Sequence, residues 1–179
     1  MEDGREDRSA SGYRVRVGGG PAFRADVVDV YVFREVEGGV EFLQLLRAGK
    51  PMAATWQPVM GHIEEGERAV ETAVRELREE IGLDAREEGG ECGCLGLWQL
   101  EQVYPYYLAD LDAIVCSPRF AAEVGGAFEP VLNDEHTGFR WTERDGDFMW
   151  PGQRLALDEV RSAIVPRDSA SREGLRIRV

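Results

Sequence analysis

The chain of 179 residues has little cysteine, and the few cysteines that it has do not form a recognisable motif. Cys92 and Cys94 are separated by a single residue, whereas the cysteines of common zinc sites are separated by about two to four. Cys116 brings the number of cysteines to three, which leaves one without a partner in any disulfide scheme. We therefore expect reduced thiols without a structural role, with a redox role for Cys92 and Cys94 as the alternative.

Long apolar runs and positive charge are also lacking. No apolar stretch approaches the roughly 20 residues of a membrane span, and the N-terminal residues have no apolar signal region, which favours a cytoplasmic protein with no membrane partner. Basic residues number 21 against 34 acidic ones, and the formal net charge of −13 opposes binding to nucleic acid. An anionic substrate must therefore be received by local positive charge or by a bound metal ion.

Several catalytic motifs are missing as well. The sequence contains no P-loop, no pattern of a Ser-His-Asp triad and no dinucleotide-binding turn, since the glycine run at 18–20 precedes a predicted strand instead of following one. A hydrophobic content of 43% fits a single domain with a sizeable core. We expect a flexible N-terminal arm over 1–20, the domain over 21–166 and a charged, loosely attached tail over 167–179.

Local patterns predict alternating strands and helices in this domain. Two apolar segments, 27–33 and 40–46, flank the turn-forming residues Glu37, Gly38 and Gly39 and predict a β-hairpin. The other expected elements are a loop at 47–55, a helix at 68–81, two antiparallel strands at 95–107 and 111–116, a loop at 124–127, a short strand around Phe139 and Trp141, and a final helix at 153–164.

The predicted helix at 68–81 has three distinct faces. Its apolar residues recur at helical spacing and form one stripe, while three glutamates share a neighbouring face: Glu76, Glu79 and Glu80. The remaining face carries Arg75 four residues after Glu71, a spacing that favours an ion pair. Grouped carboxylates repel one another unless they bind a hard cation such as Mg²⁺, although a solvated acidic face is the plain alternative.

The residues in and around this helix follow a defined spacing: Gly61, five residues, Glu67, seven residues, Arg75-Glu76-Leu77, one residue, Glu79-Glu80, one residue and Gly82-Leu83. This spacing resembles the signature of the Nudix hydrolases. The order of the flanking strands extends the resemblance over roughly residues 22–165. It implies an α/β fold, the Nudix fold, with a mixed β-sheet sandwiched between helices.

The resemblance also implies roles for individual residues. The expected ligands of Mg²⁺ or Mn²⁺ are the carboxylates of Glu76, Glu79 and Glu80, the backbone carbonyl of Met60, and Glu135 as a further carboxylate from a downstream segment. The expected catalytic set is Glu76, Glu79, Arg75 and Glu135, in which one glutamate doubles as the base and Arg75 orients a neighbouring glutamate. Glu67 would anchor the loop or help to bind metal. The alternative for Glu135 is that it only begins a turn.

The activity implied is hydrolysis of a diphosphate linkage in a nucleoside triphosphate or another nucleoside diphosphate linked to a group X. The expected substrate contacts are Trp56 and Tyr104 through their rings and Arg47 and Arg140 through their charges, with core packing or surface exposure as the alternatives. Short matches at 56–61, 134–141 and 150–154 resemble the branch that contains dihydroneopterin triphosphate pyrophosphatase and dATP pyrophosphohydrolases. A catalytically inactive Nudix domain that senses a nucleotide is the alternative function, and monomer and homodimer both stay open.

Overall fold

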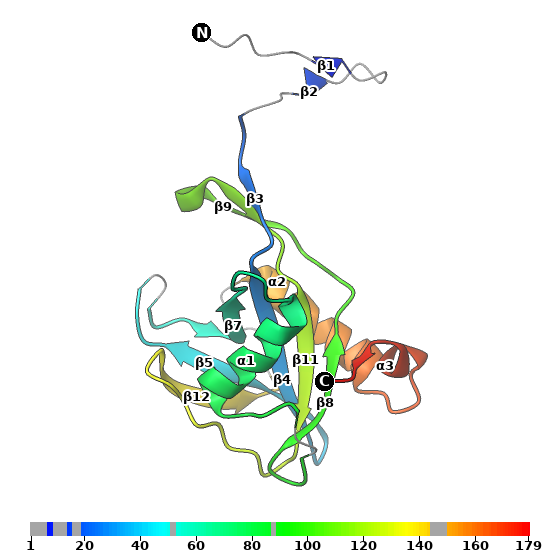
Figure 1. Ribbon diagram of the computed structural model, residues 1–179. Coiled ribbons are helices and arrows are strands. Elements are labelled where there is room, and N and C mark those ends of the chain that lie inside the picture. The colour runs from blue at the N-terminus through cyan, green and yellow to red at the C-terminus, as the bar shows by residue number, and fades with distance from the viewer. Residues whose placement is uncertain (1–6, 9–13, 16–18, 51–52, 87–88, 144–149) are drawn as a thin grey trace.

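The computed structural model describes residues 7–8, 14–15, 19–50, 53–86, 89–143 and 150–179. A large mixed sheet has the strand order β12-β5-β4-β11-β8-β13, with β6 paired to β5 and β7 paired to β4. Helix α1 crosses one face of this sheet and α2 the other (Figure 1). The strands of the large sheet are β4 (Val27–Val36), β5 (Gly39–Arg47), β6 (Trp56–Gln57), β7 (Val59–His62), β8 (Cys94–Gln99), β11 (Arg119–Val124), β12 (His136–Thr142) and β13 (Arg176–Ile177).

A smaller sheet has the order β3-β10-β9, and a separate pair joins β1 to β2. These strands are β1 (Asp7–Arg8), β2 (Arg14–Val15), β3 (Ala22–Arg24), β9 (Tyr106–Leu108) and β10 (Ala113–Val115). The helices are α1 (Ala69–Ile81), a 3₁₀ turn (Ala109–Leu111), α2 (Pro151–Glu159), which continues into a π-helical turn (Val160–Ile164), and α3 (Ala170–Gly174). None of the helices in the described part of the chain is long and apolar enough to span a membrane.

Strand β4 divides the core into two layers because successive side chains of a strand point to opposite faces. Val28, Val30 and Val32 are buried on the side of α1. Tyr31 and Phe33 are buried on the side of α2. The antiparallel pairing of β4 with β5 confirms the predicted hairpin, and two apolar faces explain why its strands are so hydrophobic.

The predicted helix at 68–81 is confirmed. Helix α1 begins after Arg68, whose backbone N–H donates to Glu71 Oε2 at 2.8 Å, and it ends at Gly82, whose φ of 72° lies in the left-handed region. The final helix and the short strand around Phe139 and Trp141 are also confirmed, as α2 with its π-helical turn and as β12.

The prediction for 95–116 is only partly correct. The segment 95–107 is not one strand, since β8 belongs to the large sheet while β9 pairs with β10 in the small one. Strand β8 ends at Gln99, and Pro105 is the last residue of the irregular segment that separates it from β9. Strand β11 was not predicted at all, although it pairs in parallel with β4 and makes the sheet mixed.

The C-terminal segment is packed on the domain, contrary to the expectation of a loose tail over 167–179. Strand β13 pairs with β8, and the indole N–H of Trp98 donates to the carbonyl of Arg172 at 2.8 Å. Backbone pairing and buried contacts therefore attach the segment to the sheet. The N-terminal arm expected over 1–20 falls largely outside the described residues.

Candidate active site

The loop and helix from Gly61 to Leu83 lie against the end of β4. Strand β7 pairs with β4 so that Gly61 is opposite Val28 and Met60 is opposite Asp29. A β-carbon on Gly61 would lie 1.9 Å from the Glu76 carboxyl carbon, so this position has no room for a side chain. The absence of a side chain at Gly61 thus makes space for the Glu76 carboxylate.

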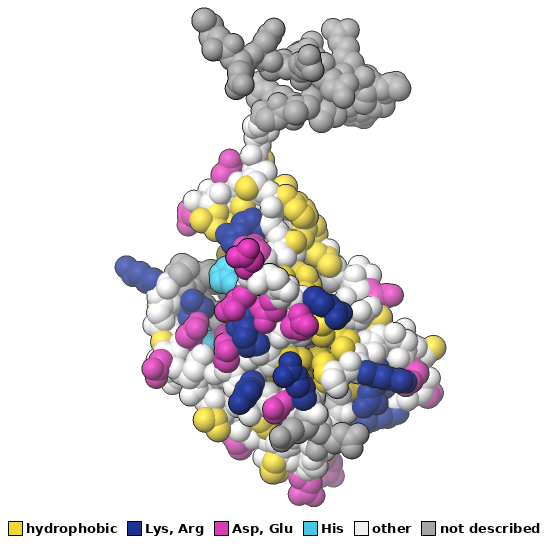
Figure 2. Space-filling model, viewed as in Figure 1, with side chains coloured by type: hydrophobic (Ala, Val, Ile, Leu, Met, Phe, Trp, Pro, Cys, Tyr) yellow, Lys and Arg dark blue, Asp and Glu magenta, His cyan; other side chains and the backbone are white. Residues whose placement is uncertain are grey.

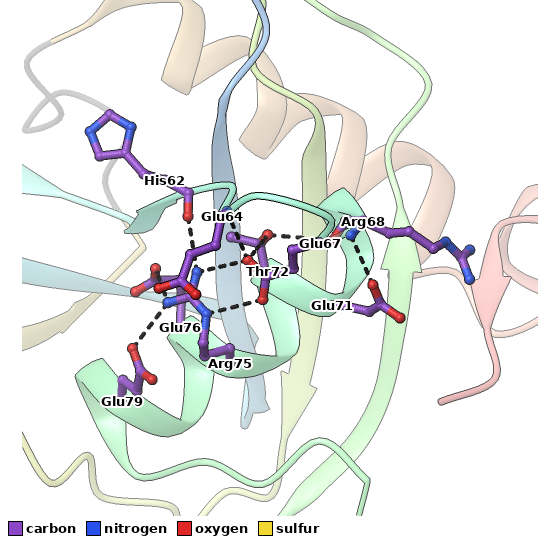
Figure 3. Close-up of polar contacts among 9 residues, drawn as sticks. All are labelled: His62, Glu64, Glu67, Arg68, Glu71, Thr72, Arg75, Glu76 and Glu79. Atoms are coloured by element: carbon purple, nitrogen blue, oxygen red, sulfur yellow. Dashed lines mark hydrogen bonds and ion pairs between the residues drawn. The ribbon is translucent and has the colours of Figure 1, made fainter.

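Arg75 is the centre of a polar network that joins the loop to the helix (Figure 3). Its Nε and Nη2 each lie 3.0 Å from a different carboxylate oxygen of Glu67, and Nη2 also donates to the carbonyl of His62 at 2.9 Å. Nη1 donates to Glu76 at 2.6 Å and to Glu79 at 3.0 Å. Arg75 thus holds two glutamates of its own helix and one of the preceding loop.

This network corrects the expected ion pair between Glu71 and Arg75. The Arg75 guanidinium instead turns toward the loop, while Glu71 accepts the hydrogen bond at the start of the helix. The Arg75 hydrogen bonds, helped by one from the Thr72 hydroxyl, lower the pKa of Glu67 to about 2. Glu67 therefore anchors Arg75 to the loop, where it also accepts a hydrogen bond from the Glu64 N–H, in agreement with the expected anchoring of the loop.

Two of the predicted metal ligands are buried carboxyls. Glu80 is 1% exposed, and its Oε2 accepts a hydrogen bond from the Met60 N–H at 3.4 Å. Burial, followed by the nearby charge of Glu76, raises the pKa of Glu80 to about 9. Burial also raises the pKa of Glu76, against the opposing effect of Arg75. Negative charge at these two side chains is therefore incompletely compensated by the protein.

The donor set fits a hard divalent cation, although the carboxylates are not gathered around one point. Within the described residues, no three Asp, Glu, His or Cys side chains converge to form a metal site. The available donors are carboxylate oxygens, which Mg²⁺ and Mn²⁺ prefer, and the under-compensated Glu76 and Glu80 would be stabilised by a cation. Glu76 and Glu79 both accept hydrogen bonds from Nη1 of Arg75.

Glu135 lies in the turn before β12, which agrees with the plain expectation that it begins a turn. Its side chain is 60% exposed and pairs with Arg47 at 4.0 Å. Its charge contributes to the raised pKa of both Glu76 and Glu80, so Glu135 lies within electrostatic range of the helix glutamates. On the face seen in Figure 2, acidic and basic side chains gather over α1.

The four predicted substrate contacts do not form one cluster. The Arg140 guanidinium lies 3.9 Å from the centre of the Trp56 ring and donates from Nε to Gln44 at 2.7 Å. Arg47 pairs with Glu135. Tyr104 lies elsewhere, beneath the guanidinium of Arg119 at 4.9 Å.

Sequence reasoning missed a buried charged pair on the α2 side of the sheet. Asp29 and Arg119 are each 3% exposed, and Arg119 Nε lies 3.5 Å from Asp29 Oδ2. The signal available was a single aspartate within the apolar segment Val27 to Phe33, where a charged side chain needs a buried partner. The partner itself lies on the unpredicted strand β11.

Comparisons with known proteins agree with this architecture. The family model described as NUDIX domain matches residues 23–148. A Sus scrofa protein named bis(5′-nucleosyl)-tetraphosphatase (asymmetrical) is 32% identical over 112 residues, which are 59% of this chain and 66%, just under two thirds, of the Sus scrofa protein.

Solved structures show the same fold. A C. elegans Ap4A hydrolase binary complex is 19% identical with a TM-score of 0.61, over 76% of this chain and 94% of that one. The E. coli dihydroneopterin triphosphate pyrophosphohydrolase is 20% identical with a TM-score of 0.64, over 79% of this chain and 97% of that one. These likenesses confirm the expected α/β architecture, and the family match shows that the chain belongs to the NUDIX domain family.

Proposed function

We propose that the protein is a divalent-metal-dependent hydrolase that cleaves a diphosphate linkage in a nucleoside polyphosphate. The observation that carries this proposal is the pair of buried, under-compensated carboxyls of Glu76 and Glu80 beside the Arg75 network. A purely structural helix would gain nothing from burying two neighbouring acids. Membership of the NUDIX domain family supports the same activity.

The residues would divide the chemistry among them. Mg²⁺ or Mn²⁺, when bound, would supply the positive charge that stabilises the phosphate during attack by water. Glu76, Glu79, Glu80 and the Met60 carbonyl would hold the cation, and Arg75 would orient Glu76 and Glu79. The proton of the attacking water would pass to Glu79 or Glu135, since these carboxylates are 53% and 60% exposed and can meet solvent.

The substrate class is supported by the relatives. The name of the Sus scrofa relative specifies a bis(5′-nucleosyl) tetraphosphate, and the E. coli structure is that of a dihydroneopterin triphosphate pyrophosphohydrolase. Both compounds consist of a heterocycle carried by a phosphoanhydride chain. Arg47 is the last residue of β5 and pairs with Glu135, and Lys50 follows it in the chain. These two cations at the end of β5 would receive the phosphates.

The test is a panel of phosphoanhydrides incubated with purified protein and Mg²⁺ or Mn²⁺, with identification of the products. The panel contains a bis(5′-nucleosyl) tetraphosphate, nucleoside triphosphates, dihydroneopterin triphosphate and ADP-ribose. We expect hydrolysis of at least one compound, dependent on the metal. If every compound remains intact while one binds, the protein is a nucleotide sensor and the proposed activity is wrong.

Matched variants test the assigned residues. Glu79→Gln and Glu80→Gln each remove one carboxylate from the proposed cation site, and we expect the rate to fall by about 100-fold or more with an unchanged fold. Glu71→Gln is the control on the same helix, because glutamine can still accept the hydrogen bond from the Arg68 N–H. A loss of activity in Glu71→Gln as large as in Glu80→Gln would count against the assignment.

A further inference from the structure

A cavity of about 340 Å³ lies between β4, the segment before β9, β11 and the beginning of α2. Three aromatic side chains form part of its wall: Tyr104, Tyr106 and Trp150. The rings of Tyr106 and Trp150 stack with their centres 5.7 Å apart and an angle of 22° between their planes. Flat aromatic walls of this kind favour a planar ligand over a branched or flexible one.

The buried pair of Asp29 and Arg119 also lines this cavity. Asp29 Oδ2 is near both the Tyr31 hydroxyl, at 3.4 Å, and Arg119 Nε, at 3.5 Å. Asp29 Oδ1 is fully buried and has no hydrogen-bond partner in the part of the chain that the structure describes. Because a buried acceptor without a donor is costly, this oxygen indicates a missing donor.

Arg119 does not supply that donor, since its Nε lies 3.5 Å from the other oxygen of Asp29 and is itself buried without a hydrogen-bond partner among the described residues. Its Nη1 donates to the carbonyl of Gly152 at 3.0 Å, and its guanidinium lies over the ring of Tyr104. Gly152 in turn leaves room for Arg119, since a β-carbon there would approach Nη2 to 3.2 Å. The buried ion pair and the aromatic side chains thus line the same cavity.

The cavity adjoins the candidate active site through one residue. Met60 lines the cavity, and Gln153 Nε2 lies 3.8 Å from its sulfur. The backbone N–H of the same Met60 donates to Glu80 on the α1 side. Met60 is therefore the residue that the cavity and the candidate active site share.

We propose that this cavity binds the heterocycle of the substrate, a planar ring of the nucleobase type, and that a ring or amino N–H donates to Asp29 Oδ1. The inference rests on the proposed function in one respect, that the diphosphate attached to the ring is cleaved at the α1 glutamates. A volume near the lower end of the range for ligand pockets, about 300–1,000 Å³, suits one heterocycle with its sugar.

Binding of nucleosides without phosphate and without metal tests the cavity separately from hydrolysis. Adenosine carries an amino N–H, whereas purine riboside has the same ring system without any ring or amino N–H. We expect adenosine to bind about 10-fold more tightly by calorimetry, because only adenosine can satisfy Asp29 Oδ1. The indole signal of Trp150 in ¹⁵N–¹H spectra, assigned by its loss in Trp150→Phe, should shift on binding.

Two variants and a control complete the experiment. Leu155→Trp adds bulk at the rim from a side chain that is 44% exposed, so the core is not disturbed, and we expect nucleoside binding to weaken by about 10-fold or more. In Asp29→Asn the amide oxygen should face the donors at the Oδ2 position, the Tyr31 hydroxyl and Arg119 Nε, so the amide NH₂ takes the place of Oδ1 and most of the preference for adenosine over purine riboside should be lost. Asp158→Asn, an exposed acid of α2 with 68% exposure, should change neither property.

The outcomes separate this inference from the proposed function. Equal binding of adenosine and purine riboside by the unmodified protein, or no nucleoside binding at all, overturns the cavity assignment even if a phosphoanhydride is hydrolysed. Selective adenosine binding together with no hydrolysis of any compound supports the cavity and overturns the enzyme. Because the comparison of the two nucleosides needs no variant, it remains decisive if Asp29→Asn fails to fold.

Discussion

Among the described residues, Glu123 is the most deeply buried acid outside the candidate active site, and we predict that the C-terminal segment is needed to compensate its charge. The Glu123 side chain is 1% exposed on β11, and Arg172 Nη2 lies 2.5 Å from its Oε2. The Arg172 guanidinium also donates to the carbonyl of Ile164 and lies 4.5 Å from the centre of the Trp98 ring. Arg167 supplies a second contact to Glu123 at 2.6 Å, from a side chain that is 60% exposed.

Arg172→Ala should therefore destabilise the protein strongly. Removing one partner of a buried ion pair costs about 3–5 kcal/mol, and the remaining contact from Arg167 favours a value of about 3 kcal/mol. For a chain of this size, about 2–4 °C per kcal/mol converts that loss into a fall in Tm of roughly 6–12 °C. Thermal unfolding followed by circular dichroism measures the Tm, and urea unfolding measures the free energy.

Arg167→Ala is the matched control, since it removes a contact to the same carboxylate from an exposed position and should cost about 1 kcal/mol or less. A double variant, Glu123→Leu with Arg172→Met, should recover stability relative to Arg172→Ala because it leaves no buried charge unpaired. The reasoning is refuted if Arg172→Ala shifts the Tm no more than Arg167→Ala does. Such a result would mean that Glu123 is solvated in solution.

Three further predictions concern the site and the cavity. Gly61→Ala places a β-carbon 1.9 Å from the Glu76 carboxyl carbon, so the hydrolysis rate should fall by about 100-fold; a rate within threefold of the original would contradict the role of Gly61. Arg75→Lys retains charge but cannot contact Glu67 through two nitrogens, and we expect a loss of about 10-fold or more in kcat, measured against Glu71→Gln. Burial raises the pKa of Asp29 to about 6 from its ordinary 3.8, against the opposing effects of Arg119 and Tyr31. The folded chain then binds more protons than the unfolded chain between these values, so urea-measured stability should fall by about 3 kcal/mol as the pH rises from 3.8 to about 6, and this component should vanish in Asp29→Asn.

The helix and the first hairpin were predictable because their signals are local. The bounds of α1 follow from apolar residues at helical spacing and from Gly82 at its end, because glycine adopts the left-handed region without strain. Strands β4 and β5 follow from alternation and from the turn between them. Each of these signals is complete within about 15 residues of sequence, so no tertiary information is needed.

Strand β11 was not predictable because its sequence has weak strand propensity. Phe120 is followed by two alanines and then Glu123, and these residues become a strand by pairing with β4 on one side and β8 on the other. The C-terminal segment was misjudged for a related reason. Its arginines look solvated when only neighbouring residues are considered, whereas their buried partner, Glu123, lies more than 40 residues upstream.

The carboxylates of the candidate active site were predictable from periodicity, but the contacts of Arg75 were not. Rotation of about 100° per residue places side chains relative to one helix and says nothing about the loop and strand before it. In the structure, Glu67 of that loop and the carbonyl of His62 in β7 turn Arg75 away from the helical face that it shares with Glu71. The roles assigned to the glutamates, to Met60 and to Glu135 stay predictions until the variants are measured.

Strand β7 connects the two halves of the proposed mechanism, and its sequence explains how. The residues that precede Gly61 are Pro58, Val59 and Met60. The Met60 side chain forms part of the cavity wall on the α2 side, while its N–H binds Glu80 on the α1 side. A backbone contact needs no particular side chain, so the residue at this position can change the shape of the cavity without removing the hydrogen bond to Glu80. Met60→Ala should therefore change the relative affinities for different heterocycles more than it changes the rate of hydrolysis of the diphosphate.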